Sequence, residues 1–443
     1  MPQLMPPAAI RSRFSTAMSA MYRAEVPLYA DLLAMVAAVN AAVLAADPRT
    51  LPADEVARLD VERHGAVRVG TAAELRLLAR VFAVMGMEPV GYYDLAGAGV
   101  PVHSTAFRAI DPAGLMESPF RVFTSLLRLE LIADEGLRAE AAATLAARRI
   151  ASPRCEELVA QAEAQGGLSP ADAAIFVAEA LDIFRWRDAA AVDLATYQHL
   201  VAAHRLVADV VAFRGPHINH LTPRTLDIDA VQAEMQARGI AAKDTIEGPP
   251  PRRVPILLRQ TSFRALSEPF RTADGDATAA HTARFGEIEQ RGAALTRAGQ
   301  ALYDACLAHA RDGDPAQPYP RRLQAAFAEF PDDLAALHAA GLAHVRFALA
   351  PGMTVLPPDI TPATAIAGGL VTIAPLTYED FLPVSAAGIF RSNLGGEARE
   401  AFAGRGSQAA FEADLGRAVH DPFALYAAAE AASWAALPVA VAR

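Results

Sequence analysis

Strand-like runs occur in two separate regions of this chain, residues 61–132 and 211–292, and a long helical stretch, 134–210, lies between them. The strand-like runs are short, rich in β-branched and aromatic residues, and bounded by glycine and proline. The intervening stretch is rich in alanine and repeats its apolar residues every three or four positions, as helices do. Strands that are spread over about 230 residues and interrupted by helices predict an α+β fold. We interpret the helical stretch as an insertion in, or a cap over, a sheet domain.

Helices are also predicted on both sides of this core. The first ~50 residues have helical spacing, and Thr71 followed by Glu74 forms a capping box at the start of a helix over 71–87. The later predicted segments are helices at 295–310 and 321–348, an irregular piece at 376–396 before a last helix, and linkers at 247–253, 272–280 and 310–320.

Composition limits the classes of function. The chain of 443 residues has a formal net charge of −10, and 53% of its residues are hydrophobic. An acidic chain has no overall field that attracts nucleic acid, so a small-molecule enzyme or a protein-binding role is favoured. Its two cysteines, Cys155 and Cys306, form no CxxC pair, which agrees with a reducing cytoplasm. The apolar run at 32–46 is shorter than the ~20 residues of a membrane span, so we predict a buried core helix and no membrane contact.

Histidines outside the predicted helices are the first candidates for chemistry, because the chain contains no GxGxxG, GxxxxGK[ST], GxSxG, HExxH or EF-hand spacing. His64 and Arg68 lie four residues apart in the predicted strand RHGAVR, so their side chains point to one face. Such a pair suits a site that binds a metal through the imidazole and an anionic substrate through the guanidinium. A solvent-facing strand would carry the same pattern, so spacing alone leaves both interpretations open.

Two more histidines, His217 and His220, lie three residues apart in PHINH. In an extended chain they face opposite sides, so only one of them reaches a site on a given face. Pro216 has no backbone donor and is expected before the strand or at its edge. His220 is therefore the better ligand candidate, and His217 is expected to have a supporting or structural role.

A carboxylate for the same site is offered by Glu287 and Glu289, which share a face if FGEIEQRG is a strand. Buried carboxylates need cations or solvent to offset their burial, and Arg284 and Arg291 could supply this charge without any metal. With the two candidate histidines, one glutamate would complete a set that leaves positions open on Fe(II) for substrate and O₂; the same set can bind zinc.

Seven motifs, in order along nearly the whole chain, carry a family resemblance. They are VERHGAVRVGTAAEL, YYDLAGAGVPVHSTAFRAI, FRVFTSLLRLELI, GPHINHLTPRTLDID, PILLRQTSF, HTARFGEIEQRGAALT and YEDFLPVSAAGIFRSNLG. These motifs resemble the 2-oxoadipate dioxygenase/decarboxylase family, also called hydroxyglutarate synthase. The resemblance implies a vicinal-oxygen-chelate-like fold, a half-open β-barrel around a metal, with large helical insertions. It also implies an Fe(II) enzyme of lysine catabolism that converts 2-oxoadipate and O₂ to (R)-2-hydroxyglutarate and CO₂.

The resemblance also assigns residues to the metal. The RHGA and NHLT motifs make His64 and His220 iron ligands, and FGEIEQ makes Glu287 the third ligand, with Glu289 as the alternative.

The resemblance assigns substrate-binding residues as well. Arg68 would bind a substrate carboxylate, and Val384 and Ser385 in LPVSAAG would line the pocket. We therefore predict one elaborated catalytic domain over residues 1–443. In the predicted domain, 61–132 and 211–292 form the sheet core with the metal ligands, 134–210 is the helical insertion, and 293–443 completes the pocket.

Three other functions remain open at this point. A vicinal-oxygen-chelate isomerase or lyase, or a dioxygenase that acts on another 2-oxoacid, would use a similar metal site. A metal-stabilised binding protein would need no open coordination position.

Overall fold

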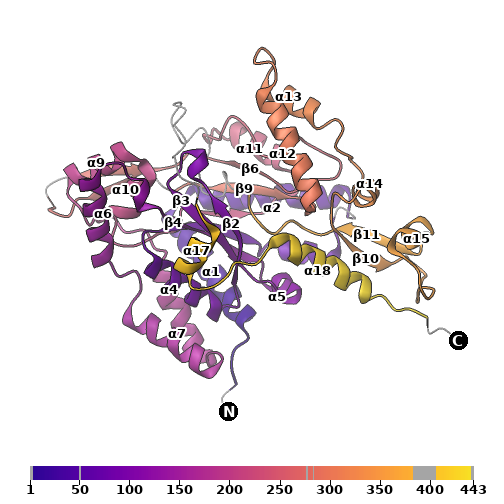
Figure 1. Cartoon of the computed structure of the whole chain (residues 1–443), viewed down its shortest axis with the longest axis horizontal. Coiled ribbons are helices and arrows are strands. Elements are labelled where there is room, and N and C mark those ends of the chain that lie inside the picture. The colour runs from indigo at the N-terminus through magenta and orange to yellow at the C-terminus, as the bar shows by residue number, and fades with distance from the viewer. Residues whose placement is uncertain (1–2, 49–50, 276–277, 283, 383–405, 441–443) are drawn as a thin grey trace. The chain divides into compact units, whose positions relative to one another are not determined.

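The computed structural model describes residues 3–48, 51–275, 278–282, 284–382 and 406–440 (Figure 1). The chain forms two compact units. The first comprises Met1–Thr245, Thr261–Ile288 and Phe381–His420, and the second comprises Ile246–Gln260, Glu289–Asp380 and Asp421–Arg443. Compact units of one chain can belong to a single domain, so the elaborated catalytic domain over 1–443 stays a prediction.

A five-stranded mixed sheet organises the first unit. Its strands are β1 (Arg63–Val69), β2 (Glu88–Asp94), β3 (Val102–Arg108), β4 (Phe120–Leu127) and β5 (His220–Pro223), in the spatial order β2-β3-β4-β1-β5. β1 runs parallel to β4 and antiparallel to β5. Since parallel neighbours cannot be joined by a tight turn, the chain leaves β1 through helix α4 (Ala72–Val84) and returns to β4 after β2 and β3. Helices around a mixed sheet confirm the predicted α+β class.

Helices fill the predicted insertion and surround the sheet. The helices are α1 (Pro7–Glu25), α2 (Leu28–Ala46), α3 (Ala53–Leu59), α5 (Pro112–Glu117), α6 (Glu135–Ala147), α7 (Pro153–Gln165), α8 (Pro170–Asp182), α9 (Leu194–Ala203), α10 (Arg205–Val211), α11 (Ile228–Ala237) and α17 (Gln408–Leu415). The stretch 134–210 is helical as predicted, from α6 to α10. The capping box is confirmed too, because the Thr71 side chain accepts a hydrogen bond of 3.2 Å from the backbone N–H of Glu74.

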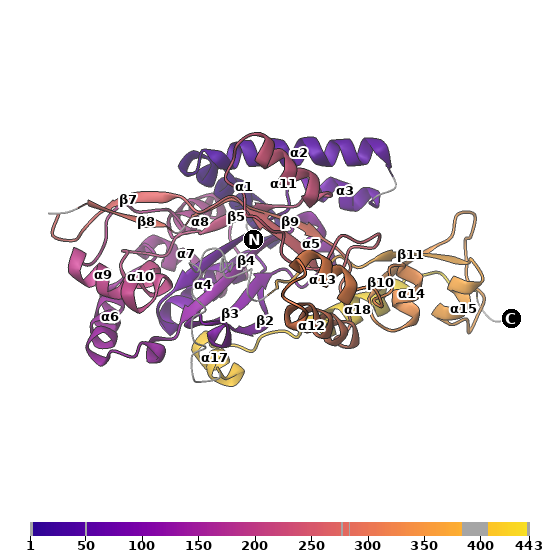
Figure 2. The same ribbon diagram turned by 90° about the horizontal axis from the view of Figure 1, so that it is seen from above.

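Helix α2 departs in part from its prediction as a core helix. Tyr29, Leu32, Met35 and Val36 on one side are buried, and Figure 2 shows α2 beside α11. The alanines on its other side are exposed. By length and composition, α2 is the one helix among the described residues that could cross a membrane, which is weak evidence because core helices of soluble proteins have the same composition.

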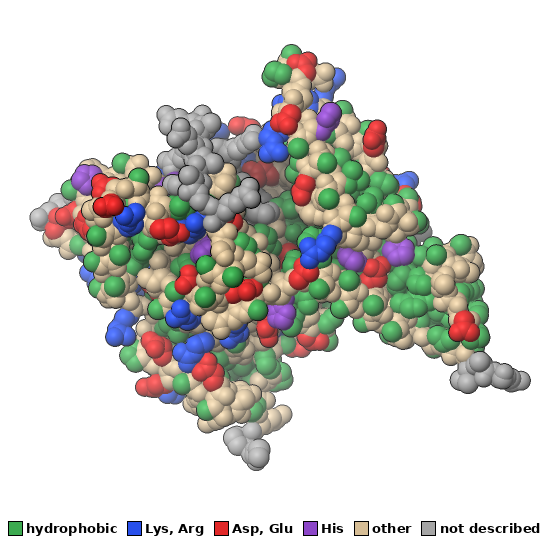
Figure 3. All heavy atoms as spheres, in the orientation of Figure 1, with side chains coloured by type: hydrophobic (Ala, Val, Ile, Leu, Met, Phe, Trp, Pro, Cys, Tyr) green, Lys and Arg blue, Asp and Glu red, His purple; other side chains and the backbone are tan. Residues whose placement is uncertain are grey.

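Charged side chains of both signs are interspersed on the face drawn in Figure 3. This mixture agrees with a chain whose 50 acidic residues outnumber its 40 lysines and arginines only modestly. Mixed charge of this kind does not concentrate positive potential on that face.

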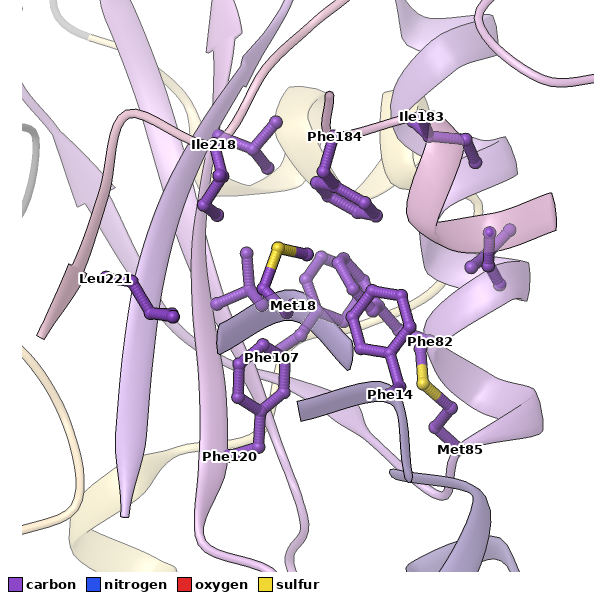
Figure 4. Close-up of a cluster of buried hydrophobic side chains, with 14 of the residues drawn as sticks. Phe14, Met18, Phe82, Met85, Phe107, Phe120, Ile183, Phe184, Ile218 and Leu221 are labelled. Atoms are coloured by element: carbon purple, nitrogen blue, oxygen red, sulfur yellow. The ribbon is translucent and has the colours of Figure 1, made fainter. Parts of the chain in front are cut away.

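An aromatic and aliphatic core fixes one face of the sheet. Phe14 and Met18 of α1 and Phe82 of α4 meet Phe107 and Phe120 of the strands, and Figure 4 shows these side chains pointing toward one another. The Phe14 and Phe120 rings pack edge to face with centroids 5.7 Å apart. Full burial of each such side chain contributes about 1.5–3 kcal/mol, so this core holds the strands that carry the site.

Three short strand pairs were predicted incompletely or not at all. They are β6 (Leu258–Ser262) with β9 (Glu287–Arg291), β7 (Ser267–Arg271) with β8 (Thr278–Thr282), and β10 (Val345–Leu349) with β11 (Val371–Pro375). The strand-like region 211–292 contains β6 and β9 as predicted. The predicted linker 272–280 is wrong at its end, because 278–280 pair with β7.

One helical prediction in the second unit is wrong in part. The stretch 321–348, predicted as helical, contains parts of α13 (Tyr319–Ala326), α14 (Leu334–Ala339) and the strand β10. Pro331 separates the two helices, and in β10 Val345 and Phe347 are buried whereas Ala348 is exposed, which is the period of a strand. The other elements of this unit are α12 (Arg297–Asp312), α15 (Pro362–Ala367) and α18 (Pro422–Ala435).

Candidate metal centre

Strands β1 and β5 bring two histidines to one face of the sheet. In the antiparallel pair, His64 lies opposite Thr222 and Ala66 lies opposite His220. Opposite residues share a face, and so do residues two apart in one strand, so His64 and His220 are diagonal neighbours. Their ring centroids are 5.4 Å apart.

Glu287, the first residue of β9, completes a group of three. Its Oε1 lies 3.0 Å from Nε2 of His64 and 3.7 Å from Nε2 of His220. One ligand atom of each residue lies within 4.8 Å of the other two, and all three side chains are fully buried. The structure therefore brings together the three residues that the sequence assigned to the metal.

Neighbouring side chains hold this arrangement. The Thr222 hydroxyl donates a 3.1 Å hydrogen bond to Oε1 of Glu287. The ring of Phe381 stands at 87° to the His64 ring, with centroids 4.9 Å apart, and Phe285 packs 4.9 Å from His220. These contacts limit rotation of both imidazoles and exclude water from around them.

The chemistry of the donors fits a divalent cation. Both ring nitrogens of His220 are buried and make no hydrogen bond to any described residue. Burial, followed by the charges of His64, Arg68 and Lys243, holds the pKa of His220 well below its usual range, so the ring is neutral, the form that binds metals. A buried imidazole without a hydrogen bond is costly, and a cation held with Glu287 would satisfy it.

Glu289 is engaged elsewhere. Its carboxylate accepts hydrogen bonds of 2.7 and 3.0 Å from Nε and Nη2 of Arg291, and both side chains are fully buried. A bidentate pair of this kind neutralises a buried carboxylate without a metal. Among the described residues, the group that could hold a metal contains Glu287 and not Glu289.

Comparisons with known proteins identify the family of this chain. A sequence model of 2-oxoadipate dioxygenase/decarboxylase matches residues 14–393. The chain belongs to the 2-oxoadipate dioxygenase/decarboxylase family. Two relatives of that name, from Pseudomonas putida and Escherichia coli, are each 56% identical to it; the alignments cover 96% and 95% of this chain and 95% and 96% of theirs. The crystal structure of the hydroxyglutarate synthase from P. putida in complex with 2-oxoadipate has a TM-score of 0.89 and 52% identity over 99% of both chains.

In this member of the 2-oxoadipate dioxygenase/decarboxylase family, Arg68 lies on the same face of β1 as His64 and forms an ion pair. Its Nη1 donates a 2.6 Å hydrogen bond to Oδ2 of Asp209, from α10. The other oxygen of Asp209 lies 2.9 Å from Nε2 of His281 and 3.4 Å from Nε2 of His217. Sequence reasoning missed Asp209 and His281. Asp209 lies in the predicted helical stretch, and His281, although it begins the motif HTARFGEIEQRGAALT, has no spacing that ties it to Arg68.

Burial and the nearby charges shift the pKa of Asp209 in opposite directions. Burial would raise its pKa, but His217, Arg68 and His281 together hold this pKa well below the usual range. Burial lowers the pKa of His217 to about 3, so His217 is neutral at pH 7 and Arg68 is the permanent counter-charge. His217 thus contacts the Arg68–Asp209 pair, in line with the supporting role predicted for it.

A buried ionic network lies beside the metal group on β1 and β4. Glu62 accepts hydrogen bonds from Arg121 at 2.5 Å and from Arg58 and Arg224 at 3.1 Å each. Arg121 is the register partner of His64 on β4. Such mutual neutralisation allows charges to be buried at this point and ties β1, β4 and the chain after β5 together.

Gly65 lets the two histidine-bearing strands approach. A Cβ there would lie 2.6 Å from Cδ1 of Ile218 and 3.0 Å from the carbonyl oxygen of His220. We expect Gly65→Ala to destabilise the protein by about 1–3 kcal/mol and to weaken metal binding, because the backbone at His220 must move. Thermal melts and metal titration check this against Gly97→Ala, whose Cβ would meet no atom within 4 Å; equal behaviour of the two variants would contradict it.

Val384 and Ser385, predicted to line the substrate pocket, lie outside the described residues.

Proposed function

We propose that this chain is an Fe(II)-dependent dioxygenase/decarboxylase that converts 2-oxoadipate and O₂ to (R)-2-hydroxyglutarate and CO₂, in lysine catabolism in the cytoplasm. The observation that carries the proposal is the fully buried group of His64, His220 and Glu287. Two histidines and one carboxylate are the ligand set of non-haem Fe(II) oxygenases. The likeness to a synthase solved with 2-oxoadipate supports the choice of substrate.

The order of elements supports a vicinal-oxygen-chelate-like arrangement for the sheet. β1, α4, β2, β3 and β4 follow one another as a βαβββ module, with β1 parallel to β4 at its edge. We propose that this module forms one side of a half-open barrel around the metal, into which α6 to α10 are inserted.

The charges of the site suit a 2-oxo dicarboxylate. When bound, Fe(II) supplies chelation of the 2-oxoacid and activation of O₂. Imidazole ligands bring no charge to a metal, so with Glu287 they would leave a net positive charge on a divalent ion, which favours an anionic substrate. The reaction is balanced without another reductant, since 2-oxoadipate and O₂ contain all the atoms of 2-hydroxyglutarate and CO₂.

Arg68 would bind the distal carboxylate of the substrate. Since Arg68 lies on the same face of β1 as His64, it is placed along the strand from the metal. Val384 and Ser385 are proposed to line the same pocket.

Arg68→Ala is expected to lower kcat/KM for 2-oxoadipate by a factor equivalent to about 2–5 kcal/mol while iron content stays unchanged. Arg68→Lys keeps the charge but loses the planar fork, so it should recover only part of this loss. Steady-state kinetics with iron analysis test the expectation. Unchanged kinetics in Arg68→Ala would remove Arg68 from the substrate site.

Oxygen uptake separates this function from its alternatives. The iron-loaded protein is expected to consume O₂ with 2-oxoadipate, and faster than with 2-oxoglutarate; the zinc-loaded protein should consume none. Conversion of substrate without O₂ uptake would favour an isomerase or lyase. Faster turnover of another 2-oxoacid would make that acid the substrate in place of 2-oxoadipate. An Fe(II) spectrum that does not change when substrate is added would favour a metal-stabilised binding protein.

A further inference from the structure

Asp209 lies at the centre of a buried polar cluster that the proposed chemistry does not use directly. We define the Asp209 cluster as Arg68, Asp209, His217, His281 and Tyr197. All five side chains are buried or nearly so, although carboxylates, arginines and histidines are costly to bury. A paired cluster that contains a proposed substrate-binding residue has a role beyond stability, because apolar side chains of the same volume would stabilise the core as well or better.

Both oxygens of Asp209 are fixed by different elements. Oδ2 accepts the 2.6 Å hydrogen bond from Nη1 of Arg68 on β1, and Oδ1 accepts the 2.9 Å hydrogen bond from Nε2 of His281 on β8. A neutral imidazole that donates through Nε2 must accept through Nδ1, and the Tyr197 hydroxyl lies 3.0 Å from that nitrogen. The hydrogen bonds thus run from Tyr197 through His281 to Asp209, which accepts on its other oxygen from Arg68.

Aromatic rings prevent the histidines of this cluster from turning. Trp186 stacks on His281 at an interplanar angle of 8° and stands at 87° to His217. The Phe213 ring lies 4.9 Å from His281. A carboxylate held by partners that cannot rotate fixes in turn the guanidinium that it binds.

We propose that Asp209, supported by His281, is the positioning residue of Arg68. A guanidinium has five donors in a rigid plane, so a hydrogen bond that fixes Nη1 also fixes the direction of the others. Asp209 sets this plane so that Arg68 can hold the distal carboxylate of a 2-oxo dicarboxylate whose other end is at the metal. The inference rests on the proposed substrate role of Arg68, and it adds that selectivity for a dicarboxylate depends on a residue that does not touch the substrate.

The test is a double-mutant cycle in the iron-loaded, full-length protein. Asp209→Asn keeps the shape of the side chain and removes its charge. We expect it to lower kcat/KM for 2-oxoadipate about tenfold or more, and to lower the preference for 2-oxoadipate over 2-oxohexanoate, which lacks the distal carboxylate. In an Arg68→Ala background the same substitution should change kcat/KM by less than about twofold, because residues that act through each other are not additive.

Glu74→Gln is the matched control. Glu74 is also a buried carboxylate, paired at 2.7 Å with Arg148 in the same unit. We expect this variant to melt at a lower temperature but to keep its substrate preference. Should Asp209→Asn fail to fold, His281→Leu serves instead, because it removes one hydrogen bond from Asp209 and leaves the charge; it should lower the preference in the same direction.

The outcomes separate the inference from the function on which it rests. Two results overturn the positioning role of Asp209 while the proposed function stands. One is that Asp209→Asn lowers kcat/KM equally in the wild-type and Arg68→Ala backgrounds, and the other is that Asp209→Asn leaves the substrate preference unchanged. Wild-type protein that does not turn over 2-oxoadipate with O₂, or Arg68→Ala with unchanged kinetics, overturns the proposed function or the role of Arg68 instead.

Discussion

His220→Ala is expected to abolish iron binding and turnover together. The substitution removes one of the three proposed ligands from a fully buried group. The remaining two, His64 and Glu287, are hydrogen-bonded to each other at 3.0 Å, so we expect them to stay paired with each other instead of binding a metal. Loss of a direct ligand should exceed the 10–100-fold loss of metal affinity that is typical of outer partners, and we expect iron retention on the order of 1% or less. Iron analysis after gel filtration, with 2-oxoadipate turnover, measures both effects.

His217→Ala is the matched control, three residues away in the same segment. The His217 ring contacts Asp209 and Asn219 rather than the metal group, so this variant should keep at least part of its iron. Loss of iron in His217→Ala with normal iron in His220→Ala would show that the wrong histidine was assigned.

Glu287→Gln and Glu289→Gln should fail in different ways. Glu287→Gln keeps the volume but removes the negative charge that a cation needs, so we expect a stable protein whose iron affinity falls on the order of 100-fold and whose turnover is lost. Glu289→Gln instead leaves Arg291 as a buried charge without its bidentate partner, which should cost about 3–5 kcal/mol of stability. The Glu289→Gln protein that folds should bind iron normally.

Chemical denaturation and iron titration of these two variants distinguish the assignments. Normal iron affinity in Glu287→Gln together with lost iron in Glu289→Gln would make Glu289 the third ligand and contradict the account.

Side-chain alternation narrowed the candidates for the metal, and the family resemblance joined His64, His220 and Glu287 into one site. Period-2 spacing put His64 and Arg68 on one face of a strand and allowed only one of His217 and His220 to reach the site, and the structure agrees on each point. Alternation could not separate Glu287 from Glu289, since both share a face. Their partners separate them: Arg291 binds Glu289, whereas Glu287 lies beside His64 and His220. These partners depend on three-dimensional packing.

Other features left no local trace in the sequence. Asp209 lies in the short helix α10 among valines and alanines, so its role comes only from pairing with Arg68, 141 positions away. Helices α6 to α10 fall between β1 and β5 in the chain, so no local turn in the sequence indicates the register of these strands. Strand β10 was hidden because a short apolar run does not distinguish a strand from a buried helix.

Anaerobic reconstitution with Fe(II), followed by 2-oxoadipate and O₂, tests the central claim most directly. We predict that activity rises with added Fe(II), saturates at one iron per chain, and yields one (R)-2-hydroxyglutarate and one CO₂ for each O₂ consumed. Equal activity of the metal-free protein, or conversion of 2-oxoadipate without O₂ consumption, would contradict the assignment.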